Sequence, residues 1–412
     1  MDAVDRKGRL VTPRFALVVV VGLLYFLSLG MLLPTVPQFV ERGLGAGDLG
    51  VGIVVGAFSV GAVLLRPFAG RVGDRAGRRV LIVGGALIVG IAVAAYHLAT
   101  GIGLLIAARV LGGIGEAAFF VGAGTMITDL APEARRGEAI SYWSVAVYGG
   151  LAFGPTIGEI VLGQDQFGHV WTLSAVLAFA AAGLALFTSE TVDHTASIGA
   201  DGQRLPPAPL LNRSALIPGT VLFLGMIGLA GFAAFVPLYV PDLGMADSRT
   251  VFLLYGCLIL AIRIFGARIP DRIGPLWAGS GATTAAAAGM FLIAALATPA
   301  GLYSGTIVFS VGMSLLYPAM LMLAITDVPA RERGSAVGTV SSFFDLSQGL
   351  GAVILGGVAA LAGYRGAFVA AGVLALVGLA VLRSGADRRI ERAEPDHEAA
   401  RIANEELEPP PP

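Results

Sequence analysis

Long apolar runs, separated by short polar turns, dominate the chain from residue 14 to residue 382. The runs are continuous and about 20 residues long, which is the length of an α-helix that crosses a bilayer. In lipid only helices and closed barrels satisfy their own backbone groups, and barrel strands would show an alternating pattern instead. The pattern therefore predicts an all-α integral membrane protein. Its twelve expected spans are 14–38, 48–69, 80–99, 102–129, 138–162, 169–187, 215–240, 248–269, 274–297, 300–327, 335–361 and 365–382.

Composition narrows the class of protein. Charged residues make up 13% of the 412 positions and apolar residues 56%, whereas a soluble domain carries about a quarter charged residues. The one cysteine, Cys257, excludes a disulfide framework and a thiolate metal cluster, and we expect neither a metal nor a cofactor. Lys7 is the only lysine, which excludes a phosphate-binding loop with its lysine and hence ATP-driven transport.

The polar turns predict the orientation in the membrane. The turn at 70–79 contains four arginines and one aspartate, and short arginine-rich loops stay in the cytoplasm. The polar start, residues 1–14, leads directly into a full-length span, so we expect no cleaved signal and both termini inside a cell membrane. Of 27 Lys and Arg residues, 21 then lie inside. Three lie outside, namely Arg42, Arg249 and Arg365. The other three, Arg66, Arg109 and Arg263, lie within spans.

An internal repeat divides the chain. Positions 66–77 recur at 263–274, an offset of 197, with Arg, Phe, Arg, Asp, Arg and Gly in register. Ile-Thr-Asp at 127–129 followed by Arg-Gly at 136–137 recurs at 325–327 and 333–334. We therefore expect two pseudo-symmetric six-helix bundles, a transporter arrangement with its site between the halves near the midplane. The expected parts are a bundle at 1–187, a cytoplasmic connector at 188–214, a bundle at 215–383 and a disordered tail at 384–412.

These motifs resemble the major facilitator superfamily over nearly the whole chain apart from the tail. Glycine at 70, aspartate four residues on and Arg-x-Gly-Arg-Arg at 75–79 match its signature between the second and third helices. Arg109 with Gly113 and Gly115 is similar to its fourth-helix motif, with Gly112 in place of a usual glutamine. Residues 334–357 are similar to bacterial sugar- and drug-efflux permeases. The resemblance implies a gate in which Asp74 faces the N-terminus of the eleventh helix, and its residues are Gly70, Asp74, Arg75, Gly77, Arg78 and Arg79.

The fifth helix resembles the superfamily's antiporter motif, which implies export. Gly150, Gly154, Pro155 and Gly158 carry the likeness, and Glu159 replaces the motif's final glycine. From the residues alone, the spaced glycines predict close helix packing and the proline predicts a bend. Glu159 falls at the outer end of the helix, where we expect an interfacial role.

Acidic residues at membrane depth are the candidates for proton coupling, because such groups are costly and usually face a cavity or a partner. Arg109 and Glu116 lie seven residues apart on one face of the fourth helix. Glu116 either takes and releases a proton or forms a structural pair with Arg109. Asp345, with Gln348 on the same face, either protonates, binds a polar substrate or serves as a fixed partner of Arg109. The first helix has no acid between residues 15 and 40.

The predicted function is secondary active transport by alternating access, as a proton-coupled exporter of a small organic solute such as a drug or a sugar. A proton-symport importer and a passive facilitator are the alternatives, and the scattered histidines argue against an enzyme. The expected partners are the solute, protons and the bilayer, without nucleic acid, and the protein is expected to be a monomer. Side chains that could line an apolar pocket, or else pack in the core, are Tyr25, Phe119, Phe120, Met226, Phe232, Met313, Tyr317, Phe344 and Gln348.

Overall fold

The computed structural model describes residues 10–132, 135–191, 211–266, 272–326, 328 and 333–405. At positions 67, 70, 71, 74, 136, 137, 141, 333, 334 and 386–405 it describes the backbone alone. Within these ranges the chain forms helices and no strands. The predicted all-α membrane fold is therefore confirmed.

The first half contains six long helices. Thr12 caps the first one, because its side chain accepts a hydrogen bond from Phe15 N at 3.2 Å and Pro13 occupies the first helical position. The helices are α1 (Pro13–Gln38), α2 (Gly47–Ala76), α3 (Arg78–Ala94), α4 (Ile102–Leu130), α5 (Arg136–Leu162) and α6 (Phe167–Ala185). Two short turns extend α1 and α3, η2 (Phe39–Gly43) and η3 (Ala95–Leu98).

The second half contains five long helices within the described residues, and the last of them is bent. Thr298 caps α11 as Thr12 caps α1, accepting a hydrogen bond from Gly301 N at 3.1 Å ahead of Pro299. Its helices are α7 (Leu216–Tyr239), α8 (Arg249–Phe265), α10 (Pro275–Ala295), α11 (Pro299–Ile325) and α12 (Arg333–Glu405), with the short turns η5 (Arg213–Ala215) and η6 (Val240–Leu243).

Ten segments of the described chain are long and apolar enough to cross a membrane. The helix α8 has 17 residues and stands just below that length. The last segment, Ser335–Gly385, has 51 residues, which at about 1.5 Å per residue is more than twice a bilayer's hydrocarbon thickness. Gly363, with φ 70° and ψ 176°, breaks its helical geometry and turns the chain back. The number of twelve crossings remains a prediction.

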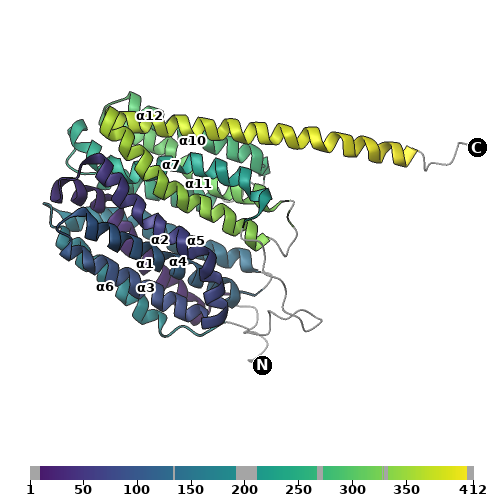
Figure 1. Ribbon diagram of the computed structural model, residues 1–412. Helices are drawn as coiled ribbons and strands as arrows, with labels where there is room; N and C mark the ends of the chain where they lie inside the picture. Colours follow the sequence, from purple (N-terminus) through teal and green to yellow (C-terminus); the bar gives the residue numbers. More distant parts are fainter. Residues whose placement is uncertain are drawn as a thin grey trace, which may run out of the picture.

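Two segments differ from the sequence-based expectation. The turn expected at 70–79 is largely helical, since α2 continues to Ala76 and α3 begins at Arg78. Gly77 alone reverses the chain with φ 104°, a conformation that favours glycine. The tail, expected to be disordered from residue 384, continues α12 as a helix to Glu405 and projects beyond the bundles (Figure 1). The tail contains many Ala, Glu and Arg residues, which are strong helix formers.

The two halves pack side by side, with α1 to α6 in one bundle and α7 to α12 in the other (Figure 1). We call the face where α1 begins and α2 ends the N-terminal face, and the other the opposite face. The sequence repeat is visible in the backbone: Gly77 (φ 104°) and Gly274 (φ 83°), 197 positions apart, each precede the third long helix of their half.

Glycines allow α2 and α12 to approach closely across the two halves. A Cβ atom at Gly56 would lie 2.5 Å from Gly349 O, and one at Gly356 would lie 3.0 Å from Gly52 Cα. We call Gly52, Gly56, Gly349 and Gly356 the glycine seam. These residues lie in the part of α2 and α12 nearer the opposite face. The seam leads along both helices toward the site described next.

Candidate functional site

One buried arginine connects the two halves. Arg66 of α2 places Nε 2.6 Å from Asp345 Oδ2 on α12 and Nη2 3.1 Å from Glu116 Oε2 on α4. The three side chains are 11%, 7% and 12% exposed, respectively. We call Arg66, Glu116 and Asp345 the charge cluster. In it, ion pairs connect α2 to α4 and to α12.

The surroundings of the charge cluster are aromatic. The Arg66 guanidinium lies 5.2 Å from the centre of the Phe120 ring. Tyr25 is fully buried and stacks on Phe119 with their ring centres 3.6 Å apart. In such a low-dielectric environment opposite charges attract one another more strongly than in water. Removing one partner leaves the other charge buried and uncompensated, which costs much free energy. The cluster is therefore a strong contact between the halves only while its charges remain balanced.

Arg109 is not part of this cluster. Its Nε donates to Val54 O at 3.3 Å, its Nη2 donates to Val55 O at 3.2 Å, and its guanidinium lies 4.6 Å from the centre of the Phe58 ring. The pairing of Arg109 with Glu116 or Asp345 that the sequence suggested is wrong. Residues seven apart on a helix share a face but are separated by about 10 Å along its axis, so Glu116 bonds Arg66 on the neighbouring helix instead.

Seven of the nine predicted pocket-lining residues fall into two groups. Tyr317 Oη lies 3.0 Å from Ser341 Oγ, and its ring packs edge-on against Phe344 with centres 5.9 Å apart. Tyr317 is also within electrostatic range of Arg66 and Asp345. The other group packs in the interior of its own bundle and is at most 3% exposed: Tyr25, Phe119, Met226, Phe232 and Met313. Gln348 Nε2 donates to Met226 O at 3.4 Å. A cavity-lining role for these residues stays a prediction.

The predicted gate lies at the N-terminal face. Glu190, after α6, accepts hydrogen bonds from Arg78 N at 2.9 Å and Arg79 N at 3.2 Å, so its carboxylate caps the N-terminus of α3. Arg78 Nε lies 3.6 Å from Asp129 Oδ2 at the end of α4. These contacts hold the turn inside the first half, and Arg75 is exposed. The side chain of Asp74 lies outside the described residues, as does Asp271, so the contact of Asp74 with the eleventh span stays a prediction.

The glycines of the fifth-helix motif face α1. Cβ atoms at Gly150, Gly154 and Gly158 would lie 2.5 Å from Phe26 Cβ, 2.6 Å from Gly30 Cα and 2.6 Å from Met31 O. Pro155 lies inside α5. The motif thus packs the first and fifth helices backbone to backbone.

Glu159 forms a second contact between the halves, at the opposite face. It is 8% exposed, and its Oε1 accepts hydrogen bonds from Gln38 Nε2 at 2.9 Å and Ser248 Oγ at 2.5 Å. Ser248 immediately precedes α8, so the contact joins α1 and α5 to the other bundle. The sequence marked Glu159 as a departure from a motif and predicted an interfacial role for it, but not its partners. Its partners, 121 and 89 positions away, have no local signal.

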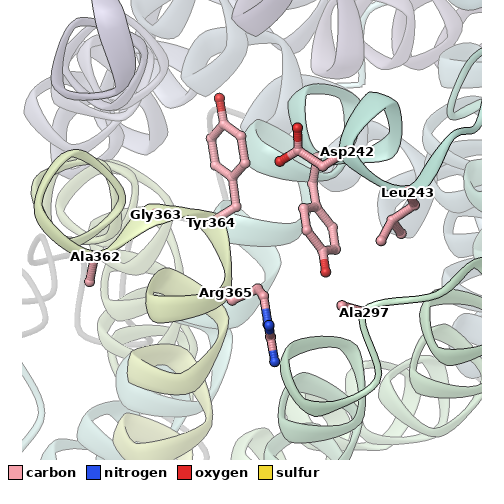
Figure 2. Close-up of a pocket in the computed structure, with 8 residues that line it drawn as sticks. Asp242, Leu243, Ala297, Ala362, Gly363, Tyr364 and Arg365 are labelled. Atoms are coloured by element: carbon pink, nitrogen blue, oxygen red, sulfur yellow. The ribbon is translucent and has the colours of Figure 1, made fainter.

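A cavity of about 260 Å³ opens on the opposite face of the second half, and Figure 2 shows its lining side chains. Arg365 crosses its edge and donates from Nε to Ala294 O at 2.7 Å. The cavity shares no residue with the charge cluster. It is lined by Tyr239, Asp242, Leu243, Ala297, Ala362, Gly363, Tyr364 and Arg365.

Comparison with known proteins places this geometry in a family. The family model described as the Major Facilitator Superfamily matches residues 18–352. An uncharacterised MFS-type transporter of Salmonella typhimurium is 30% identical over 369 residues, covering 87% of this chain and 93% of that protein. An uncharacterised MFS-type transporter of Burkholderia mallei is 28% identical over 366 residues, covering 86% and 88%.

Solved structures share the fold. The human organic anion transporter TETRAN superposes with a TM-score of 0.69 at 20% identity, covering 90% of this chain and all of that one (100%). A bacterial homologue of the human lysosomal transporter Spinster, in an inward-facing conformation, gives 0.73 at 15% identity, covering 90% and 95%. The nucleoside transporter NupG gives 0.72 at 12% identity, covering 90% and 99%. At these identities the likeness concerns the fold alone.

Proposed function

The chain belongs to the major facilitator superfamily of membrane transporters for small solutes, and we propose that it is a proton-coupled exporter working by alternating access. The observation that carries the proposal is the charge cluster. One guanidinium there faces two carboxylates, one from each half of the protein. A group that changes charge at the junction of two moving halves is what coupling between proton binding and conformation requires.

The formal charges explain how protonation would be coupled to conformation. One arginine balances one carboxylate, so the cluster carries −1 when both acids are ionised and zero when one is protonated. An uncompensated charge in a low-dielectric interior is costly, whereas a balanced pair is tolerated. Taking up one proton therefore changes the free energy of holding Arg66 and Asp345 together, and with it the preference between the two conformations.

We assign the two carboxylates different roles. Asp345 approaches Arg66 to 2.6 Å and comes from the other half, so it serves as the contact that closes and opens. Glu116 accepts hydrogen bonds from Arg66 Nη2 at 3.1 Å and 3.5 Å and belongs to the same half, so its protonation changes the charge that Arg66 presents to Asp345. Glu116 is therefore the proposed proton carrier.

Direction and orientation are part of the same proposal. The positive-inside rule supports a cytoplasmic position for the arginine-rich N-terminal face. The proposal locates the protein in the cell membrane with both ends inside. The likeness of α5 to the antiporter motif and of residues 334–357 to efflux permeases supports export of a drug- or sugar-like solute against inward proton flow. The protein acts as a monomer, with its solute bound between the halves.

The test uses purified protein in proteoliposomes with a panel of drugs and sugars, with and without a proton gradient. A solute that accumulates only with the gradient identifies a substrate. Glu116→Gln should then abolish uphill transport but retain counterflow exchange, because the amide imitates a permanently protonated acid. Asp165→Asn, at an exposed pair with Arg42, is the matched control and should transport normally.

Two outcomes would change the assignment. If Glu116→Gln concentrates substrate and Asp345→Asn does not, the proton carrier is Asp345. Accumulation that persists unchanged after addition of an uncoupler would remove the proton from the mechanism and favour a facilitator.

A further inference from the structure

The charge cluster has a counterpart in the second half that lacks its acids. Arg263 corresponds to Arg66 at the repeat offset of 197. The helices α5 and α12 both begin at an Arg-Gly pair, and Tyr148 stands as far along α5 as Asp345 stands along α12. Met313 likewise stands as far along α11 as Glu116 along α4. A tyrosine and a methionine thus replace the two carboxylates.

The contacts follow this correspondence. The Arg263 guanidinium lies 3.5 Å from the centre of the Tyr148 ring, so α8 and α5 meet across the halves as α2 and α12 do. Arg263 Nε is buried and has no hydrogen-bond partner among the described residues. No ion pair of Arg263 occurs within those residues either. Tyr255, on the same helix, is within electrostatic range of both Arg263 and Tyr148.

Arg263 is a half-buried cation near the end of α8, and its Nε has no acceptor among the described residues. Its guanidinium offers five N–H donors in a planar fork, and stacking on one ring engages its face rather than these donors. The planar fork matches carboxylate, sulfonate and phosphate groups with paired hydrogen bonds. The neighbouring tyrosines offer an apolar ring surface with a polar end. Together they suit a small molecule with a negative group and an apolar body.

We propose that Arg263, Tyr148 and Tyr255 form the binding site for an organic anion, with Arg263 holding its negative group. The inference rests on the proposed function, since the anion is the transported solute. Tyr317 is within electrostatic range of Tyr148 on one side and of Arg66 and Asp345 on the other. A bound anion therefore adds negative charge close to the cluster that takes up the proton, which makes anion binding and protonation mutually dependent.

The competing explanation is a purely structural stack that clamps α5 to α8. The two explanations differ in charge selectivity. The probes are benzenesulfonate, a permanent anion, and benzyltrimethylammonium, a permanent cation with the same ring. Both are tested by isothermal titration and thermal stabilisation of the purified full-length protein. The variants are Arg263→Gln, Arg263→Lys and, as matched control, Arg383→Gln, which removes an arginine stacked 4.4 Å from the Trp277 ring in the same half.

The anion should bind and raise the Tm of the wild type, and the cation should do neither. Arg263→Gln should weaken benzenesulfonate binding about 10- to 100-fold, the range for losing hydrogen bonds to a charged group. Arg263→Lys should weaken it less, and Arg383→Gln should bind as the wild type does. Should Arg263→Gln fail to fold, the wild-type selectivity and the Lys variant decide the question, because Lys keeps the charge.

Wild-type binding of the cation in preference to the anion would overturn the proposal, as would unchanged anion affinity in folded Arg263→Gln. Failure of the proton mechanism has a different signature. Glu116→Gln that still transports uphill, while benzenesulfonate binding still depends on Arg263, refutes the coupling role and leaves the anion site. Proton-driven transport of a cation, without anion binding, refutes the anion site alone.

Discussion

The contact between Arg66 and Asp345 predicts a measurable coupling free energy. At an effective dielectric constant of 20, opposite charges 4 Å apart attract by about 4 kcal/mol, and desolvation of the two ions offsets part of this. We expect a double-mutant cycle with Arg66→Met and Asp345→Asn to give a coupling of about 2 kcal/mol, within the range seen for residues in contact. The cycle with Glu116→Gln should give less, because Glu116 lies 3.1 Å from Arg66 rather than 2.6 Å.

Reversible unfolding in mixed detergent micelles, followed by tryptophan fluorescence, measures these free energies, since Trp143 and Trp171 are buried. The matched control is the pair Arg135–Glu138, which has a similar distance of 2.8 Å but side chains 40% and 43% exposed. Its coupling should stay at about 0.5 kcal/mol or below, as is usual for exposed pairs. A coupling at Arg66–Asp345 no larger than that of the control would refute the view that burial makes this contact strong.

Three further predictions concern the two faces. Glu159→Ala should loosen the opposite face, by about 2 kcal/mol for the lost hydrogen bonds, and so increase labelling of cysteines introduced beside it; Glu159→Gln should lose less. Gly77→Ala should cost about 1–3 kcal/mol in unfolding assays, because φ is 104° there and the added methyl group would overlap Glu190. Asp74→Asn should insert normally but transport poorly, whereas Asp271→Asn should be tolerated; normal transport by well-expressed Asp74→Asn would exclude the gate.

Much of the fold could be predicted because its signals are local or repeated. Apolar runs of about 20 residues indicate spans, and the recurrence of 66–77 at 263–274 indicates two related halves. The turn at 70–79 was predicted less well. Counting charges marks where a membrane boundary lies, but a helix continues past that boundary as far as its residues allow, and here only Gly77 ends it.

The charge cluster could be predicted only in part. Glu116 and Asp345 were recognisable as acids at membrane depth, and both lie in the cluster. Their partner was not recognisable, because helix periodicity relates residues of one helix and Arg66 lies on another. The same limit explains the wrong pairing of Arg109, whose donors bond the backbone of α2. Arg263 and Tyr148 could have been found by applying the repeat offset to the acids as well as to the arginines.

The glycine seam also sets the scale of the energy that transport must supply. Helices that meet through glycine backbones bury little side-chain surface. No side-chain rotamers have to interlock when the helices come together again. Separation there costs little compared with separating a packed leucine interface. One proton moving down 100 mV releases about 2.3 kcal/mol, and each pH unit adds about 1.4 kcal/mol. In the proposed proton-coupled cycle, the low cost of opening the seam leaves most of the free energy released by a proton for breaking the charged contacts between the halves and for concentrating the solute.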